Sequence, residues 1–159
     1  MSARPRESVW DYPRPPRVEP CDRPVRVEHA GELLAESQRA LRVLETASPP
    51  TIYIPAEDVR TELLSEVAGE HTQCEWKGRA HYLRLEPDSA PAEAVAWHYP
   101  KPREAYAQLL GHLAFYAGRV DACWLGDERV RPQGGGFYGG WVSDEIEGPY
   151  KGEPGSEGW

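Results

Sequence analysis

The fold is decided by two neighbouring segments, CEWKGRAHY (residues 74–82) and AWHYPKP (residues 96–102). Together they hold two tryptophans, two tyrosines, two histidines and two lysines. Aromatic residues at strand-like spacing on both sides of a loop predict a β-hairpin. The same density of aromatic and titratable groups is typical of a binding cleft. This central hairpin is therefore where we expect the functional site.

The flanking sequence predicts two further hairpins, because apolar and polar residues alternate on each side of a tight turn. They pair residues 25–29 with 32–37 around Ala30-Gly31, and residues 121–125 with 128–131 around Gly126-Asp127.

The stretches between the hairpins predict more strands and little helix. Residues 41–45 are expected to continue the first hairpin as a meander, and residues 51–54 form a short β-rich run. A short helix is predicted at about 56–65, and a second one from Pro102, since proline suits the first turn of a helix. Whether that helix continues through 112–116 or gives way to a strand is open. Many short strands with one or two short helices predict a mainly β, antiparallel fold.

The two ends of the chain differ in composition from the middle. Residues 1–24 hold six of the 16 prolines, and residues 132–159 hold nine of the 15 glycines. Both ends also contain several large aromatic residues, which disordered segments lack. We therefore expect two ordered, irregular arms laid across a single mainly β core domain at 25–131.

Composition excludes several classes of function. The net charge of −8 argues against general binding to nucleic acid or to an anionic membrane. No apolar run approaches the ~18 residues of a membrane span. The first residues lead into Glu7, Trp10 and Asp11 rather than into an apolar signal-peptide core, so we expect a cytoplasmic protein.

The cysteines do not predict a metal site. Cys21, Cys74 and Cys123 are far apart, and the sequence has no C-x-x-C pair. A structural zinc site normally needs such pairs. We therefore expect reduced cysteines and neither a metal nor another cofactor.

Two registers of the central hairpin are compatible with the sequence. If Leu85 lies opposite Glu93, then His81 faces Trp97, and the opposite face carries Tyr82 and His98 among small alanines, as the floor of a pocket would. A slip of one residue brings Tyr82 against Trp97 instead. Alternation alone leaves both registers open.

The candidate ligand-binding residues all belong to this hairpin. Each has a structural alternative: the tryptophans can be core residues, the lysine can belong to a turn, and the histidine can be held by structural hydrogen bonds. The candidates are Trp76, Lys77, Tyr82, Trp97, His98 and Tyr99.

Segments over about residues 7–125 resemble one known family, domain of unknown function 427. The resemblance rests on ESVWDYPRPP (7–16), Gly31 with AES (35–37), YIP (53–55) with Asp58-Val59, and the two segments of the central hairpin. It implies a compact domain of β-tent, or Mss4-like, architecture, in which two antiparallel sheets meet at an angle. Such domains often carry a zinc ion on C-x-x-C pairs, which this chain lacks. The tail from Gly134 to Trp159 resembles an extension seen in some members.

A nucleotidyltransferase-like label is attached to the family, but the residues do not support it. Such enzymes hold two magnesium ions on spaced carboxylates, and the chain has no D-x-D sequence. It also lacks a phosphate-binding G-x-x-x-x-G-K loop and the G-x-S-x-G of a hydrolase.

Three hypotheses for the function remain. The first is a small-molecule-binding domain with an aromatic cleft, in which rings stack on the ligand and Lys77 takes an anionic group. The second is a metal-independent enzyme that uses His98 or Tyr82 for acid-base chemistry and Lys77 as an anchor. The third is a protein interaction module or homodimer whose aromatic arms contact the partner.

Overall fold

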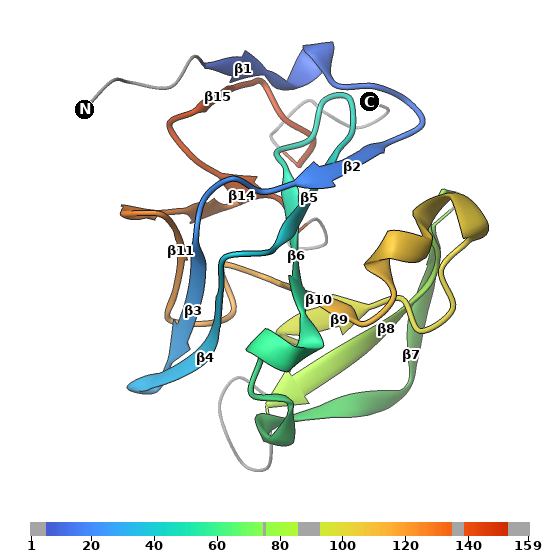
Figure 1. The fold of residues 1–159 in the computed structure, drawn as a ribbon, viewed down its shortest axis with the longest axis vertical. Coiled ribbons are helices and arrows are strands. Elements are labelled where there is room, and N and C mark those ends of the chain that lie inside the picture. Colours follow the sequence, from blue (N-terminus) through green and yellow to red (C-terminus); the bar gives the residue numbers. More distant parts are fainter. Residues whose placement is uncertain (1–5, 75, 86–92, 135–138, 153–159) are drawn as a thin grey trace.

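The computed structural model describes residues 6–74, 76–85, 93–134 and 139–152. These residues form two larger antiparallel sheets and two short strand pairs, and their helical segments are short 3-10 turns (Figure 1). The prediction of a mainly β, antiparallel domain is confirmed.

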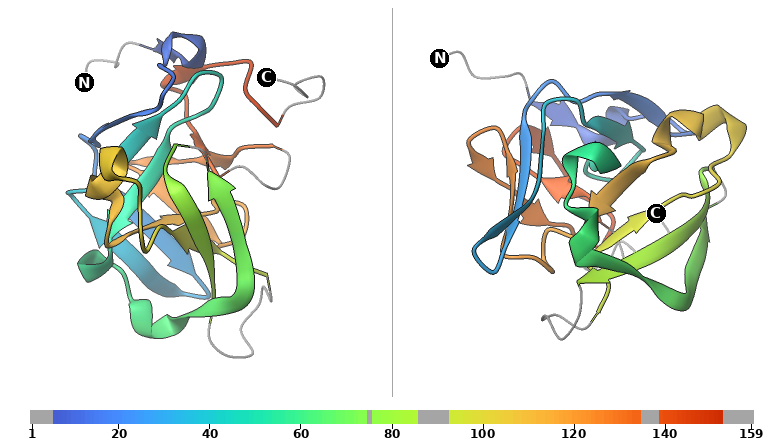
Figure 2. Two further views of the ribbon diagram at one scale, coloured as in Figure 1. Left: turned by 90° about the vertical axis from the view of Figure 1, so that its right-hand side faces the viewer. Right: turned by 60° about the horizontal axis from the view of Figure 1, so that its bottom comes forward.

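The larger sheet has seven strands in the order β2-β5-β6-β10-β9-β8-β7, and every neighbouring pair is antiparallel. It extends from β2 to the long strands β7 and β8 at the opposite edge (Figures 1 and 2). Its strands are β2 (Arg17–Pro20), β5 (Leu41–Leu44), β6 (Thr51–Pro55), β7 (Leu64–Cys74), β8 (Gly78–Leu85), β9 (Ala96–His98) and β10 (His112–Phe115).

The second sheet has four strands in the order β12-β11-β3-β4 and contains both flanking hairpins as predicted. Ala30 and Gly31 both have positive φ, of 52° and 78°, as a two-residue hairpin turn requires. The predicted meander is wrong, since the strand at 41–44 pairs with β2 and β6 rather than with β4. The strands are β3 (Val25–His29), β4 (Glu32–Ser37), β11 (Ala122–Leu125) and β12 (Glu128–Arg129).

Strand alternation gives the seven-stranded sheet two different faces. Ile52 and Ile54 point to one side, where they join residues of the four-stranded sheet in the first core. Tyr53, between them, points to the other side into a second cluster. We call this second side the aromatic face; it comprises Tyr53, Ala80, Tyr82, Trp97, Tyr99, Ala114 and Tyr116.

The predicted helices are shorter than expected. The helix expected at 56–65 is two 3-10 turns, η2 (Ala56–Asp58) and η3 (Thr61–Leu63), separated by residues in extended or irregular conformation. The helix expected from Pro102 is η4 (Glu104–Leu109), which buries two of its side chains. Gly111, with φ of 76°, follows it, and the open stretch at 112–116 begins as strand β10.

The described parts of both arms are folded against the body. Strand β1 (Glu7–Ser8) pairs in parallel with β15 (Ile146–Glu147), so the two arms meet (Figure 1). Strand β13 (Arg131–Pro132) pairs with β14 (Trp141–Val142), and η1 (Val9–Asp11) follows β1. The side chains of Val9 and Trp141 are fully buried. No helix in the described part of the chain has the length and apolar character needed to span a membrane.

Candidate functional site

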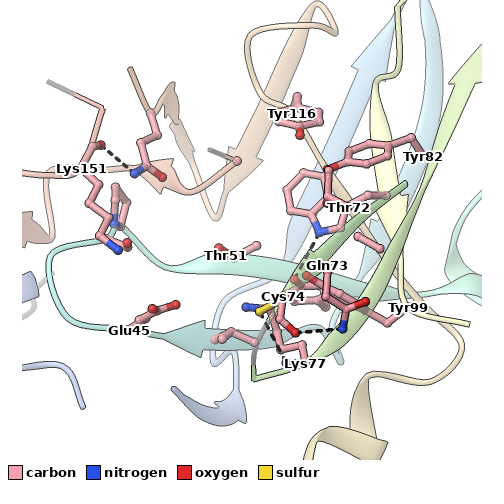
Figure 3. Close-up of a pocket in the computed structure, with 18 residues that line it drawn as sticks. Glu45, Thr51, Thr72, Gln73, Cys74, Lys77, Tyr82, Tyr99, Tyr116 and Lys151 are labelled. Carbon is pink, nitrogen blue, oxygen red and sulfur yellow. Dashed lines mark hydrogen bonds between the residues drawn. The ribbon is translucent and has the colours of Figure 1, made fainter. Parts of the chain in front are cut away.

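A cavity of about 260 Å³ lies on the aromatic face of the seven-stranded sheet. Strands β5 to β9 and the segments beside them supply most of its lining, and the C-terminal arm supplies the rest (Figure 3). A cavity of this size suits a metabolite-sized ligand. Its aromatic lining residues are Tyr53, Tyr82, Trp97, Tyr99 and Tyr116, and its charged lining residues are Glu45, Lys77 and Lys151.

The β8–β9 register brings two large rings together at this cavity. Tyr82 is the strand partner of Trp97, and His81 is the partner of His98. The register with His81 opposite Trp97 is therefore wrong, and the register slipped by one residue is the one observed. It allows both Tyr82 and Trp97 to be only 7% exposed on the same face, while Leu83 packs against the first core.

Hydrogen bonds between side chains fix the rings. Trp97 Nε1 donates to Tyr53 Oη at 3.3 Å, and the two rings meet edge to face with centroids 6.3 Å apart. Tyr82 Oη and Thr72 Oγ1 share a hydrogen bond of 2.8 Å across β7 and β8. Burial raises the pKa of both Tyr53 and Tyr99 above the usual range. Both phenols therefore keep their protons and can donate hydrogen bonds.

Lys77 brings a positive charge to the cavity. Its Nζ lies 5.9 Å from the centroid of the Tyr99 ring. Among the described residues, no carboxylate forms an ion pair with this ammonium. Burial alone would lower the pKa of Lys77, but the nearby Tyr53, Cys74 and Glu45 raise it, and the net pKa lies above the ordinary value. Lys77 is therefore a charged, half-buried cation that Glu45 stabilises at longer range and that forms no ion pair with a described carboxylate.

The turn that carries Lys77 depends on the glycine after it. Gly78 has φ of 117°, and a Cβ there would lie 3.2 Å from the carbonyl oxygen of Lys101. The amide of Lys77 donates to Cys74 Sγ at 3.5 Å, and its carbonyl accepts from the amide of Arg103 at 2.9 Å. These contacts hold Lys77 at the cavity (Figure 3).

The structure brings four of the six predicted site residues to the cavity, namely Lys77, Tyr82, Trp97 and Tyr99. Trp76 packs against the aromatic cluster half-buried and does not line the cavity. His98 lies on the opposite side of the sheet because its register partner is His81 rather than Tyr82.

His98 belongs instead to a row of histidines across three strands. The ring centroids of His71 and His81 are 6.1 Å apart, and those of His81 and His98 are 6.0 Å apart. Glu66 contacts Nδ1 of His81 and lies 3.9 Å from Nε2 of His98. Among the described residues, no group of three or more histidine, cysteine, aspartate or glutamate side chains could hold a metal ion.

Sequence reasoning missed the cavity residues that come from outside the central hairpin. Tyr53 lies on β6 and Tyr116 directly follows β10, and both sit beside Trp97 only because of the strand order. The alternation of Ile52, Tyr53 and Ile54 was a usable signal, because it separates the tyrosine from the core isoleucines. No comparable signal marks Gln133, Gly139 and Lys151 of the C-terminal arm, which also line the cavity.

Comparison with known proteins gives a family but no activity. No curated protein matches this chain. The model of one family, described as domain of unknown function (DUF427), matches residues 17–126, which is more than half of the chain. These residues include both strands of the central hairpin and the turn that carries Lys77. The chain therefore belongs to the family of domain of unknown function 427.

Proposed function

We propose that the chain binds a small molecule with a flat aromatic part and an acidic group, in the cavity on the aromatic face. The observation that carries the proposal is Lys77. Its ammonium is half-buried, it lines the cavity, and it forms no ion pair with a described carboxylate. The pKa of Lys77 lies above its ordinary value, so the group is charged at neutral pH, and an acidic ligand in the cavity would give it a direct ion pair.

The other lining groups support the same ligand chemistry. The phenols of Tyr53 and Tyr99 stay protonated and hydrogen-bond each other, so one proton of the pair is left to join Lys77 as a donor to a ligand. A carboxylate only accepts hydrogen bonds, so it complements such a set of donors. The rings of Tyr82 and Trp97 offer aromatic surface to a flat ligand. The β-tent, or Mss4-like, resemblance agrees with this proposal, since related domains bind ligands in aromatic cages.

The geometry gives less support to the two alternatives. An enzyme that used His98 in the cavity is disfavoured, because His98 lies on the other side of the sheet. Tyr82, the other acid-base candidate, does line the cavity, but its hydroxyl is already engaged with Thr72 Oγ1 at 2.8 Å. For an interaction module, the exposed large apolar residues of the described chain lie at three separate places: Trp10 on η1, Leu33 on β4 and Leu110 directly after η4.

A thermal-shift and calorimetric assay with matched probes tests the proposal. The probes are benzoate, nicotinate and indole-3-acetate, each compared with its neutral amide. We expect at least one acid to bind about tenfold or more tightly than its amide, as a hydrogen bond to a charged group predicts. Lys77→Met keeps the length of the side chain and removes the charge, so it should abolish this preference.

Lys101→Met is the matched control, because Lys101 is exposed and does not line the cavity. It should bind like the wild-type protein. Native mass spectrometry of the purified protein supplies a second measurement, in which a retained small acid should be present in the wild type and absent from Lys77→Met. The proposal is wrong if no acid binds and none is retained, or if Lys77→Met keeps the preference for the acid.

A further inference from the structure

One wall of the cavity is built by residues beyond the matched family segment. The match ends at residue 126, whereas Gln133, Gly139 and Lys151 line the cavity. We call these three residues the C-terminal wall. The family segment supplies the aromatic rings and Lys77, and this chain adds the C-terminal wall from its own extension (Figure 3).

Gln133 holds the C-terminal wall together. Its side chain is buried, with only 6% of the residue exposed. Its Oε1 accepts from the amide of Gly140 at 3.0 Å, and its Nε2 donates to the carbonyl of Lys151 at 2.7 Å. One amide side chain thus links two segments of the arm, and both of its polar ends are satisfied.

Gly139 allows the C-terminal wall to pack closely against the aromatic face. A Cβ at this position would lie 2.0 Å from Cη2 of Trp97, so a side chain there would overlap the ring. Backbone and indole therefore meet directly at the cavity, which both residues line.

Further bonds fix the C-terminal wall to the body. The amide of Lys151 donates to the carbonyl of Ala47 at 2.8 Å. Trp141, which is 2% exposed, donates through Nε1 to the carbonyl of Phe115 at 3.0 Å. The C-terminal wall is therefore a fixed part of the cavity, and the backbone of Lys151 is in place before a ligand binds.

Lys151 adds a second cation. Among the described residues it forms no ion pair, and the charged groups around the cavity are then two lysines and one glutamate. Lys77 enters from the turn after β7, and Lys151 enters from the C-terminal arm, at separate places around the cavity (Figure 3). The lining therefore favours a ligand with negative charge at two positions over a ligand with one.

We infer that the C-terminal wall selects ligands that carry a second acidic group, which Lys151 binds while Lys77 binds the first. This inference rests on the proposed function, since it assigns a further contact in the same cavity. The substrate class is then a flat aromatic or conjugated diacid. Lys151 is the specificity-determining residue, and Gln133 is the positioning residue that holds its backbone.

Three probes of one shape separate the two lysines: terephthalate, its monoamide 4-carbamoylbenzoate, and the neutral terephthalamide. For the wild-type protein we expect affinity to fall in that order, by roughly three- to tenfold for the second acid group, as expected for a half-buried charge pair. Lys151→Met should remove the preference for terephthalate over the monoamide. It should leave the preference for the monoamide over terephthalamide unchanged.

Lys77→Met should show the opposite pattern and lose most of the affinity for the monoamide. The inference fails if Lys151→Met still prefers terephthalate over the monoamide as strongly as the wild type does. The proposed function fails, and the inference with it, if the wild type binds all three probes equally or binds none of them. The hydrogen bonds of Lys151 to Ala47 and Gln133 are made by its backbone, which Lys151→Met keeps, so the variant should retain the wild-type melting temperature.

Discussion

His98 carries a buried ring nitrogen, Nε2, that has no hydrogen-bond partner in the part of the chain that the structure describes. Burial lowers the pKa of His98 below its ordinary value, Glu66 opposes this effect, and His81 adds to it. A histidine in this state is better accommodated without a proton. His98 therefore makes the folded protein sensitive to acid.

The sign of this effect follows from proton linkage. The unfolded chain, in which His98 has its ordinary pKa of 6.5, takes up the proton more readily than the folded protein does. The contribution of His98 to stability is thus fully present above about pH 6.5 and is lost as the pH falls below that value. We expect His98→Gln to flatten the pH dependence of the unfolding free energy between about pH 5 and 7.

Urea denaturation at several pH values provides the measurement. Glu66 and His81, which lie beside His98, are unchanged in the variant. His112→Gln is the control: His112 precedes Leu113, the strand partner of His98, so its side chain points to the opposite face of the sheet. It contacts the carbonyl of Leu110 at 3.0 Å. An equal change of slope in both variants would mean that His98 has no special role.

At the level of elements, strand β7 is an exposed edge of the seven-stranded sheet. Its pairing with β8 shifts register between Glu66 and His71, and Gly69 within this stretch has φ of 76°. Such an irregularity bends an edge strand and protects it from pairing with other chains. The end of β7 nearest the cavity is tied to β8 by the bond between Thr72 and Tyr82.

Tyr82→Phe should loosen this end of β7. The variant keeps the ring on the aromatic face and removes the 2.8 Å bond to Thr72, with a cost of about 0.5–1.5 kcal/mol. Hydrogen exchange at residues 71–74 should therefore become faster by roughly two- to tenfold. Tyr106→Phe, which loses a 2.7 Å bond to the carbonyl of Pro16, is the control. If both variants accelerate β7 equally, the effect is global and the bond is not a local tie.

The elements that could be predicted from sequence are those specified by local residues. The hairpin around Ala30-Gly31 is one. Two alternating segments separated by a two-residue turn predict a hairpin, and both turn residues have the positive φ that such a turn needs. Strand β7 could not be predicted from the sequence. Its residues are mostly half-exposed or exposed, so they show no clear apolar alternation, and its pairing depends on β8. The β8–β9 register escaped for a related reason: both registers preserve alternation, and the packing of Tyr82 and Trp97 against distant strands decides between them.

At the level of the whole molecule, the two arms hold each other. The guanidinium of Arg42 on β5 donates twice to Glu7 at 3.1 Å and once to Glu19 at 2.6 Å. It thereby lowers the pKa of Glu7. Glu7 in turn pairs with β15 of the C-terminal arm. A side chain of the central sheet thus supports both arms.

Arg42→Met should destabilise the protein by about 1.5–3 kcal/mol, because two partly buried carboxylates lose their shared cation. Arg39→Met is the matched control: Arg39 also binds a carboxylate, that of Asp58, but its side chain is 61% exposed. Urea unfolding of both variants gives the comparison, and we expect a clearly smaller loss for Arg39→Met. Equal losses would show that the arms contribute nothing beyond a surface ion pair.

The candidate site likewise combines residues that are close in the sequence with residues that only the fold brings together. Lys77 and the aromatic residues beside it could be found from sequence, since they crowd into one hairpin. Tyr53 and the C-terminal wall could not, because only the path of the whole chain brings them to Trp97. His98 was assigned to the cavity by the register that the structure does not adopt.

The parallel pairing of β1 with β15 also orders events during synthesis. Residues 7 and 8 are synthesised well before their partners, residues 146 and 147. At ordinary translation speed the gap is roughly 7 to 28 seconds. During this interval Trp97 has no Gly139 against its ring, and Lys151 has not yet been made. The cavity of the nascent chain therefore lacks its C-terminal wall, and any ligand selection that depends on Lys151 begins only after that wall has been synthesised.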